Sequence, residues 1–291
     1  MKKVIGVYRN QNTHWVGDGF LVKNLFSYDR LGQAISPFLL LDYAEPHHFE
    51  PTEQQHGVGS HPHRGFETVT LAYQGEVTHK DSSGGGGTIQ AGDVQWMTAA
   101  SGVVHEEFHS NDFAAQGGLF EMVQLWINLP AKDKMSAPRY QALKSDAIPT
   151  IELDDGAGHI RVIAGEFNGQ QGPAATFSPV NVWDGVLKAE YETFVHVPEL
   201  HNVILVVLSG DVTVNTTQKV QANSIVMFGK ENQAIRLQAE TDTKFLVLTG
   251  EPLDEPIQGY GPFVMNTKQE IIEAFDDFNQ GRFGQIEVSE V

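Results

Sequence analysis

Two short clusters of histidine and glutamate in the first half of the chain have the spacing of a metal site. His61 and His63 stand one residue apart, and His105 and Glu107 repeat that spacing further along. Side chains two residues apart on a β-strand point to the same face. If the two strands lie side by side, three imidazoles and one carboxylate meet at a single point. By the same period Glu67 lies on the face of His63, so it competes with Glu107 as the carboxylate.

This set of ligands favours a divalent transition metal. Neutral imidazole suits Fe, Ni, Cu or Zn, and a carboxylate adds hard character. Four protein ligands leave room for water, a substrate or O2 on a five- or six-coordinate ion. The chain has no cysteine, so it offers neither a disulfide nor a reactive thiol. Any redox sensing would therefore fall on the metal alone.

Most of the other histidines are expected on surfaces or in loops. They are His47, His48, His56, His79, His109, His159 and His201. By period two His109 shares the strand face of His105, so it is the one of this group that could approach the metal.

Short apolar and β-branched segments around these clusters predict an all-β protein. The expected strands are residues 20–22, 38–41, 67–73, 76–79 and 121–129. The glycine-rich stretch 82–87 is followed by neither Lys-Ser nor Lys-Thr and begins no helical pattern. A hairpin loop is therefore favoured over a phosphate-binding loop. Residues 133–148 are predicted to be a linker to a second domain.

One helix is predicted near the C-terminus, over residues 267–280. The run from Thr267 to Glu270 is a capping box. Ile271, Phe275 and Phe278 then fall at helical spacing on one apolar face. We expect that face to pack on a barrel, and the alternative is a helix that binds a partner.

The second half of the chain repeats the first. Residues 73–78 match 208–213, and 90–94 match 221–225, with the change of offset at the glycine-rich stretch. A repeat of this length predicts two copies of one double-sheet barrel. At these offsets His61 falls on His196, His63 on Pro198, Glu67 on Asn202, His105 on Arg236 and Glu107 on Gln238. Only one histidine remains, so the second copy is predicted to hold no metal.

Charge and hydropathy exclude some classes of function. Lys and Arg number 19 against 37 Asp and Glu, and the net charge is −18. An acidic surface repels phosphate, so direct binding of nucleic acid is disfavoured. The longest apolar runs, such as 38–41 and 203–208, are strand-length and too short to span a membrane. The N-terminus lacks the apolar run of a signal peptide, and we expect a cytoplasmic protein.

Several motifs, in order along nearly the whole chain, resemble the pirin family of the cupin superfamily. The two half-motifs typical of cupins are His-x-His-x-x-x-Glu with a turn at Gly75, and Gly-x-x-His ending at His105. The longer pirin-like runs are residues 37–42, 61–75, 92–99, 102–107, 124–132, 250–252 and 261–267.

The resemblance implies an all-β fold of two tandem cupin barrels, each a double-stranded β-helix or jelly roll, with a short C-terminal helix. Residues 1–132 would form an N-terminal metal-binding barrel and 133–148 the linker. Residues 149–291 would form a degenerate C-terminal barrel that carries the helix 267–280. Pirins hold their metal in the N-terminal barrel only.

The resemblance also assigns roles to the two glutamates. In pirins the fourth ligand is the glutamate two residues after the last histidine, which is Glu107 here. We therefore expect one divalent ion bound by His61, His63, His105 and Glu107. Glu67 would hold an imidazole or a metal-bound water. Fe(II) is the expected ion, and Mn, Ni, Cu and Zn also suit such a set.

Two functions follow from the resemblance. In the first, the protein is a dioxygenase that cleaves a small aromatic substrate, a flavonol such as quercetin, with O2, and Glu107 takes the proton of the flavonol hydroxyl. In the second, it is a metal-containing, redox-sensing module whose protein partner is a transcription factor or a metabolic enzyme. A deep apolar cavity over the metal would favour the enzyme, and a closed, filled barrel the binding module.

Overall fold

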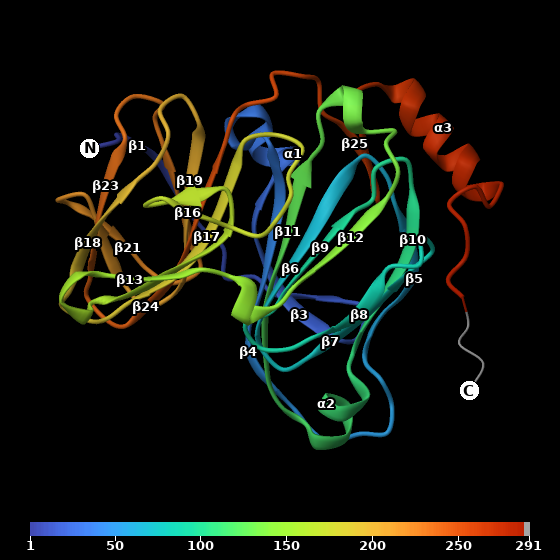
Figure 1. The fold of residues 1–291 in the computed structure, drawn as a ribbon, viewed down its shortest axis with the longest axis horizontal. Helices are drawn as coiled ribbons and strands as arrows, with labels where there is room; N and C mark the ends of the chain where they lie inside the picture. The colour runs from blue at the N-terminus through green and yellow to red at the C-terminus, as the bar shows by residue number, and fades with distance from the viewer. Residues whose placement is uncertain (288–291) are drawn as a thin grey trace. The chain divides into compact units, whose positions relative to one another are not determined.

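The computed structural model describes residues 1–287 and confirms the all-β, two-barrel fold (Figure 1). The chain divides into two compact units. Each unit is built on one seven-stranded and one four-stranded antiparallel sheet. Side chains from the facing sheets of such a barrel meet in its interior, which is where a buried site can form.

The N-terminal barrel has the sheet orders β12-β9-β6-β11-β4-β3-β2 and β5-β10-β7-β8. Its strands are β2 (His14–Val16), β3 (Phe20–Ser27), β4 (Phe38–Phe49), β5 (Gly57–His63), β6 (Phe66–Gln74), β7 (Val77–Asp81), β8 (Gly86–Ile89), β9 (Val94–Thr98), β10 (Val103–His109), β11 (Gly118–Asn128) and β12 (Arg139–Leu143). Further elements of this unit are α2 (Asn111–Gln116), η2 (Ala131–Asp133), β25 (Gln258–Tyr260), β26 (Phe263–Met265) and α3 (Lys268–Asn279).

The C-terminal barrel has the sheet orders β1-β22-β19-β24-β17-β14-β13 and β18-β23-β20-β21, with a separate pair β15-β16. Its strands are β1 (Val4–Arg9), β13 (Thr150–Glu152), β14 (Gly158–Ala164), β15 (Glu166–Phe167), β16 (Gln170–Gln171), β17 (Val180–Leu187), β18 (Glu192–His196), β19 (Asn202–Ser209), β20 (Val212–Val214), β21 (Gln218–Val220), β22 (Ser224–Phe228), β23 (Ala234–Ala239) and β24 (Thr243–Gly250). Its short helices are α1 (Tyr28–Leu31), η1 (Gly32–Ile35), η3 (Ser145–Ala147) and η4 (Asp154–Gly156).

The expected domain boundaries differ from these two units in four places. Residues 24–37, which carry α1 and η1 and were expected in the N-terminal barrel, belong to the C-terminal unit. Strand β1, expected in the N-terminal barrel, pairs with β22 of the C-terminal barrel. Strand β12 lies in the expected linker but pairs with β9. Residues 254–287 belong to the N-terminal unit. A period of two identifies a strand but not the sheet that it joins, because pairing between distant segments leaves no local pattern.

The glycine-rich stretch 82–87 is a hairpin connection, as predicted. Strands β7 and β8 pair on either side of residues 82–85, and Gly86 and Gly87 already belong to β8. The Asp81 carboxylate accepts hydrogen bonds from the Ser83 and Gly85 backbone N–H groups at 2.8 and 3.0 Å. An aspartate that bonds backbone N–H groups ahead of it stabilises a tight turn.

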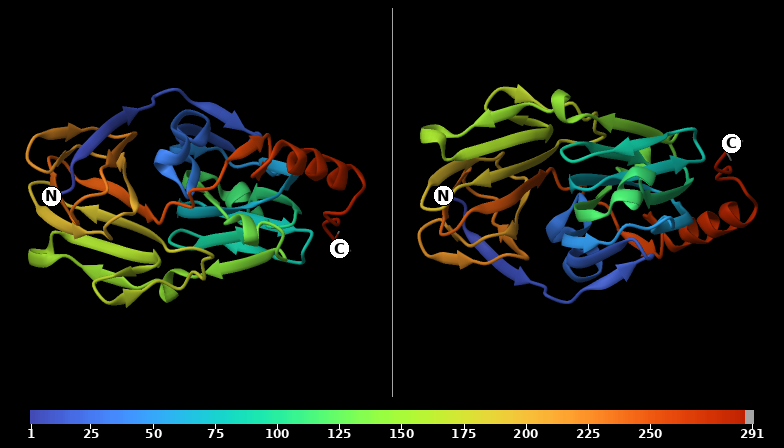
Figure 2. Two further views of the ribbon diagram at one scale, coloured as in Figure 1. Left: turned by 90° about the horizontal axis from the view of Figure 1, so that it is seen from above. Right: turned by 90° about the horizontal axis from the view of Figure 1, so that it is seen from below.

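The C-terminal helix α3 forms with the predicted capping box, in which the side chains of Thr267 and Glu270 each accept from the other's backbone N–H. Its apolar face contributes Ile271 and Phe275 to a cluster with Phe263 of β26. The red ribbon of α3 can be followed near the C-terminus in Figures 1 and 2. The face therefore packs within its own unit, as expected.

Two buried basic side chains hold this C-terminal segment against the N-terminal barrel. Arg64 donates to the Ser101 carbonyl at 2.6 Å and to the Asp277 carboxylate at 2.8 Å. Lys134 Nζ donates to the carbonyls of Gly65 and Val264. Burial lowers the pKa of Lys134 to about 7, and these carbonyls satisfy its N–H groups in place of water.

The pairing registers correct the predicted alignment of the two barrels by one residue. Thr78 pairs with Phe108, whereas its repeat partner Thr213 pairs with Gln238. Phe108 therefore corresponds to Gln238, and the positions on either side shift with it. A shift of one residue moves each side chain to the other face of its strand.

With the corrected register, the positions that match the candidate ligands are buried and apolar. His61 corresponds to Val195, His63 to Val197, His105 to Ile235 and Glu107 to Leu237. The assignment to Arg236 and Gln238 is wrong because one residue is missing between β22 and β23 relative to β9 and β10. The assignment to His196 and Pro198 is wrong because the corner between β18 and β19 has one residue more than the corner between β5 and β6.

No helix within residues 1–287 has both the length and the apolar character that crossing a membrane requires.

Candidate metal centre

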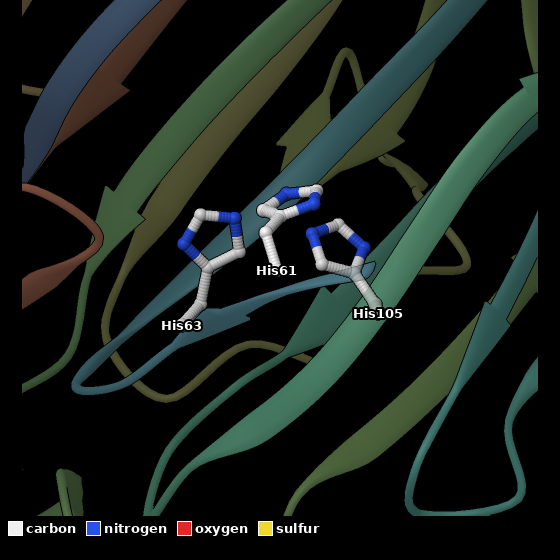
Figure 3. Close-up of side chains that lie close together, drawn as sticks. All are labelled: His61, His63 and His105. Carbon is white, nitrogen blue, oxygen red and sulfur yellow. The ribbon is translucent and has the colours of Figure 1, made fainter. Parts of the chain in front are cut away.

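Three imidazoles meet in the interior of the N-terminal barrel, as the sequence predicted (Figure 3). His61 and His63 come from β5 and His105 from the neighbouring strand β10, where His105 pairs directly with His61. One nitrogen from each ring lies within 4.8 Å of the others. Strand β5 is a sheet edge, which is where Pro62, lacking an N–H group, can be accommodated between the two histidines.

Each ring is oriented by a contact at Nδ1. His61 Nδ1 lies 2.8 Å from the Gly59 carbonyl and His63 Nδ1 lies 3.3 Å from the Pro262 carbonyl. A carbonyl only accepts, so both rings carry their proton on Nδ1 and present an unprotonated Nε2. The carbonyl at Pro262 precedes β26, so the C-terminal segment orients one of the candidate ligands.

His105 supplies the test of fit for a metal. Its Nε2 is buried and has no hydrogen-bond partner among residues 1–287. Its Nδ1 lies 3.3 Å from His79 Nδ1. A buried nitrogen without a partner is costly unless a ligand satisfies it. With His61 and His63 presenting Nε2 as well, the three rings fit a divalent ion bound through nitrogen.

The electrostatics also suit a metal. Burial lowers the pKa of His63 to about 3, and the neighbouring His61 adds to the effect. Burial and the two other rings hold the pKa of His105 well below its usual range. Both rings are therefore neutral at physiological pH, which is the form that binds metal.

Glu107 follows His105 on the same face of β10 but stands slightly apart from the three rings. One of its carboxylate oxygens lies within 4.8 Å of a ring nitrogen of His105 and of a ring nitrogen of His79. Gln95 Nε2 donates to Glu107 Oε1 at 3.0 Å, and the Thr70 hydroxyl lies 3.4 Å from the same oxygen. Both contacts are at Oε1, which leaves Oε2 for a metal ion or for the proton of a substrate.

The expected role of Glu67 does not agree with its position. Its Oε1 accepts from the Thr98 hydroxyl at 2.7 Å. It lies on the opposite face of β6 from Thr70, which contacts Glu107. The period of two does not continue from His63 to Glu67, because Gly65, with φ of +91°, turns the chain between β5 and β6. Burial raises the pKa of Glu67 to about 7.

Two histidines expected on surfaces or in loops are buried instead. His109 packs among Phe20, Phe49 and Phe120, and its Nε2 lies 3.0 Å from the Gly19 carbonyl. It belongs to neither group of candidate metal ligands within residues 1–287. His79 is fully buried beside His105.

The polar side chains that surround the candidate ligands were not predicted from the sequence. His79 Nε2 lies 3.0 Å from Asp81 Oδ2, and the Tyr140 ring stacks on His79 at 5.0 Å between centroids. Tyr140 comes from the expected linker. The spacing of two residues between His79 and Asp81 indicates that they share one face of a strand. Their place beside the candidate ligands could not be predicted, because it depends on the pairing of β7 with β10.

A cavity of about 210 Å³ opens onto the candidate centre. His61, His63 and Glu107 form part of its lining. Its apolar wall consists of Val16, Phe20, Val22, Val58, Met122 and Trp126. Asp42 and Gln124 add two polar groups. A mostly apolar cavity with a few polar groups is typical of a small-molecule site.

Comparison with known proteins agrees with this architecture. The pirin family model matches residues 19–127, and the model of the pirin C-terminal cupin domain matches residues 182–284. A crystal structure of quercetin 2,3-dioxygenase from Acinetobacter baumannii is 63% identical, with a TM-score of 0.97, and the match covers 99% of this chain and 100% of that one.

Curated relatives extend the similarity to other organisms. A Pseudomonas aeruginosa protein with a provisional name as a quercetin 2,3-dioxygenase is 56% identical over 283 residues, which is 97% of this chain and 99% of the relative. A pirin-like protein of Solanum lycopersicum is 37% identical, and the match covers 98% of this chain and 92% of the relative. These matches span both barrels, and this chain belongs to the pirin family.

Proposed function

We propose that this pirin is a metal-dependent dioxygenase that cleaves flavonols such as quercetin with O2. The observation that carries the proposal is the cavity that ends on His61, His63 and Glu107. An apolar wall suits a flat aromatic ligand, and a binding module would have no need of open space over the ion. The similarity to proteins named as quercetin dioxygenases supports the same reaction.

The imidazoles of His61, His63 and His105, with the Glu107 carboxylate, would hold one divalent ion. Fe(II) is our first choice, and Mn, Ni, Cu and Zn suit the same donors. The ion would supply Lewis acidity and, where it is redox-active, one-electron chemistry with O2. The chain supplies the neutral rings and the cavity that shields the reaction from water.

Glu107 is the proposed general base. Gln95 donates to its Oε1, so that Oε2 is the oxygen that can take the proton of the flavonol 3-hydroxyl. A positioned base of this kind contributes on the order of 10²–10⁴ in rate. Gln124 accepts from the Thr70 hydroxyl at 2.8 Å through Oε1, so its amide N–H groups can face a hydroxyl of the substrate.

The test is the variant Glu107→Gln, assayed for metal content, quercetin binding and O2 uptake. An amide keeps an oxygen ligand but cannot accept a proton at neutral pH. If Glu107 is the base, the variant keeps appreciable metal and quercetin and loses on the order of 10²–10⁴ in rate. If Glu107 is a ligand only, the losses of metal and of activity follow each other.

Glu106→Gln is the matched control. Glu106 is the neighbouring residue on β10, and alternation points it to the other face of the strand. It pairs with Lys80 in the ladder and lies outside the lining of the cavity. The control should keep both metal and rate, and an equal loss in both variants would contradict the assignment of Glu107.

A further inference from the structure

The buried pair of His79 and Asp81 has no role in the chemistry described so far. Both side chains are almost completely buried, at 0% and 4% exposure. They lie two residues apart on β7, which pairs with the strand of His105 and Glu107. A buried polar pair in an otherwise packed barrel is costly to keep unless its groups are all satisfied and used.

The hairpin fixes the orientation of the Asp81 carboxylate. Its Oδ1 accepts from the Ser83 N–H at 2.8 Å, the Ser83 hydroxyl at 2.6 Å and the Gly85 N–H at 3.0 Å. Its Oδ2 lies 3.0 Å from His79 Nε2. A carboxylate only accepts, so His79 donates its Nε2–H to Asp81.

That donation determines the proton positions further inward. When a neutral His79 carries its proton on Nε2, its Nδ1 is unprotonated and accepts hydrogen bonds through its lone pair. His105 Nδ1 lies 3.3 Å away and can donate to it only if His105 carries its proton on Nδ1. His105 Nε2 is then an unprotonated donor atom, and this is the nitrogen that lies buried with no partner within residues 1–287.

Gln95 connects the same pair to the second candidate ligand of β10. Its Nε2 lies 3.2 Å from His79 Nδ1 and 3.0 Å from Glu107 Oε1. An amide group has two hydrogens, so it can serve both acceptors at once. Tyr140 covers the His79 ring in a stacked arrangement with an interplanar angle of 16°. These contacts restrict the ring of His79 in position as well as in proton placement.

We propose that Asp81 and His79 form a positioning relay, in which Asp81 sets the tautomer of His79 and His79 sets the tautomer of His105 for metal binding. The proposal rests on the metal centre proposed above and not on the substrate. His79 could itself be a ligand, because His79, His105 and Glu107 also lie within 4.8 Å of one another. We favour the relay because both ring nitrogens of His79 already have partners.

The sharpest variant is Asp81→Asn. The three donors of the hairpin will hold the asparagine oxygen, so its NH₂ group will face His79 Nε2. His79 must then carry its proton on Nδ1, which donates to His105 Nδ1 and leaves the His105 proton on Nε2. Gln95 loses one acceptor in this state and keeps its hydrogen bond to Glu107. Replacing the aspartate by its amide therefore reverses both tautomers, although the shape of the side chain is nearly unchanged.

The experiment measures Zn(II) affinity by competition with a chelator and the ¹⁵N shifts of the His105 ring in the metal-free protein. We expect Asp81→Asn to fold, to show His105 protonated on Nε2, and to bind Zn(II) on the order of 10–100-fold more weakly. Unchanged affinity, or an unchanged tautomer of His105, would overturn the relay.

Asp93→Asn is the matched control for loss of a buried aspartate in the same barrel. Asp93 is 6% exposed and bonds Lys144, Ser145 and Gln90, away from the candidate ligands. This variant should lose stability but keep the affinity for Zn(II). An equal loss of affinity in both variants would show a general effect on folding and contradict the relay.

A second variant covers the case in which Asp81→Asn does not fold. His79→Leu removes the acceptor of His105, and it should also weaken Zn(II) binding on the order of 10–100-fold. In a relay the two residues act as one unit. The double variant of Asp81 and His79 should therefore bind Zn(II) no more weakly than whichever single variant binds it less tightly. Additive losses would contradict the relay.

The measurement of Zn(II) affinity separates this proposal from the proposed function. Zn(II) affinity is measured without flavonol or O2, so the relay can hold even if quercetin is not a substrate. The dioxygenase can likewise turn over even if Asp81→Asn binds metal normally. A wild-type protein that binds neither Zn(II) nor any other divalent ion would overturn the centre on which both depend.

Discussion

The two barrels share a topology but fill their interiors in opposite ways. In the C-terminal barrel the positions that match His61, His63 and His105 are Val195, Val197 and Ile235. They belong to one large apolar cluster together with Leu237, at the position of Glu107. The same backbone register thus supports either a hydrocarbon core or a polar site.

The polar surroundings of the ligands follow the same division. His79, which contacts His105, corresponds to Val214, which is buried in the apolar cluster. A candidate ligand and its partner are therefore both polar in one barrel and both apolar in the other. A half-converted interior would leave a buried polar group without a partner, which costs more than either complete form.

The largest expected effect comes from making the N-terminal barrel like the C-terminal one. The triple variant His61→Val, His63→Val and His105→Ile should contain no bound metal, because it has lost all three imidazoles. Elemental analysis after gel filtration measures the loss. Circular dichroism should show that the fold is retained, because the C-terminal barrel demonstrates that these side chains fit the register. The melting temperature should fall, because His79 loses its contact with His105. Retention of one metal per chain would contradict the assignment of the site.

A second comparison concerns the corner before β6 and before β19. Gly65 has φ of +91°, and a Cβ there would lie 2.0 Å from the Val264 carbonyl oxygen. Its counterpart Leu200 has φ of +67° but is 70% exposed. We expect Gly65→Ala to lower the free energy of unfolding by roughly 3–5 kcal/mol, since both strain and a backbone clash result.

The control for that change is Leu200→Gly. A leucine at positive φ is strained by about 1 kcal/mol, and glycine relieves the strain but adds entropy to the unfolded chain. The free energy of unfolding from urea titration should therefore change by at most about 1 kcal/mol. Equal destabilisation by the two variants would show that the contact with Val264 does not determine the need for Gly65.

A smaller and pH-dependent effect is expected at Glu67, whose counterpart Asn202 is neutral. Burial raises the pKa of Glu67 from 4.5 to about 7, so the folded state binds its proton more tightly than the unfolded state does. The stability that Glu67 contributes is then complete below about pH 4.5 and is lost as the pH rises through about 7.

Glu67→Gln imitates the protonated form at every pH. The variant and the wild type should be equally stable near pH 4, and above pH 7 the variant should be more stable by up to about 3 kcal/mol. Metal content should stay the same, because the carboxylate lies on the other face of β6. Denaturant titrations at several pH values measure the difference in stability. A loss of metal in this variant would show that Glu67 does take part in the metal site.

The smallest effect is expected at His196, the residue that the offset of the repeat in the sequence matched to His61. It is exposed at the end of β18, and its neighbour Val195 occupies the interior position. His196→Ala should leave both metal content and melting temperature unchanged. A loss of metal in this variant would show that the C-terminal barrel takes part in binding.

The sequence predicted those parts of the site that depend on local spacing. The alternation of His61 with His63 survives because both stand on one uninterrupted strand. Glu67 was misplaced because a glycine corner separates it from that strand. His105 was matched to Arg236 instead of Ile235 because the loop before β23 is one residue shorter than the loop before β10. A shift of one residue exchanges the two faces of the strand that follows.

The parts that depend on distant pairing could not be predicted. Tyr140 was assigned to a linker, and only the pairing of β12 with β9 places it over His79. The carbonyl at Pro262 reaches His63 because the chain returns to the first barrel after completing the second. Neither contact leaves a local pattern, because the partners are brought together by the fold alone.

The most direct test of the account is O2 uptake on addition of quercetin to protein loaded in turn with Fe, Mn, Ni and Cu. The account predicts metal-dependent consumption of O2 by at least one loaded form, and none by the triple variant of His61, His63 and His105. If fully metallated wild-type protein consumes no O2 with quercetin or any other flavonol, the proposed dioxygenase function is contradicted.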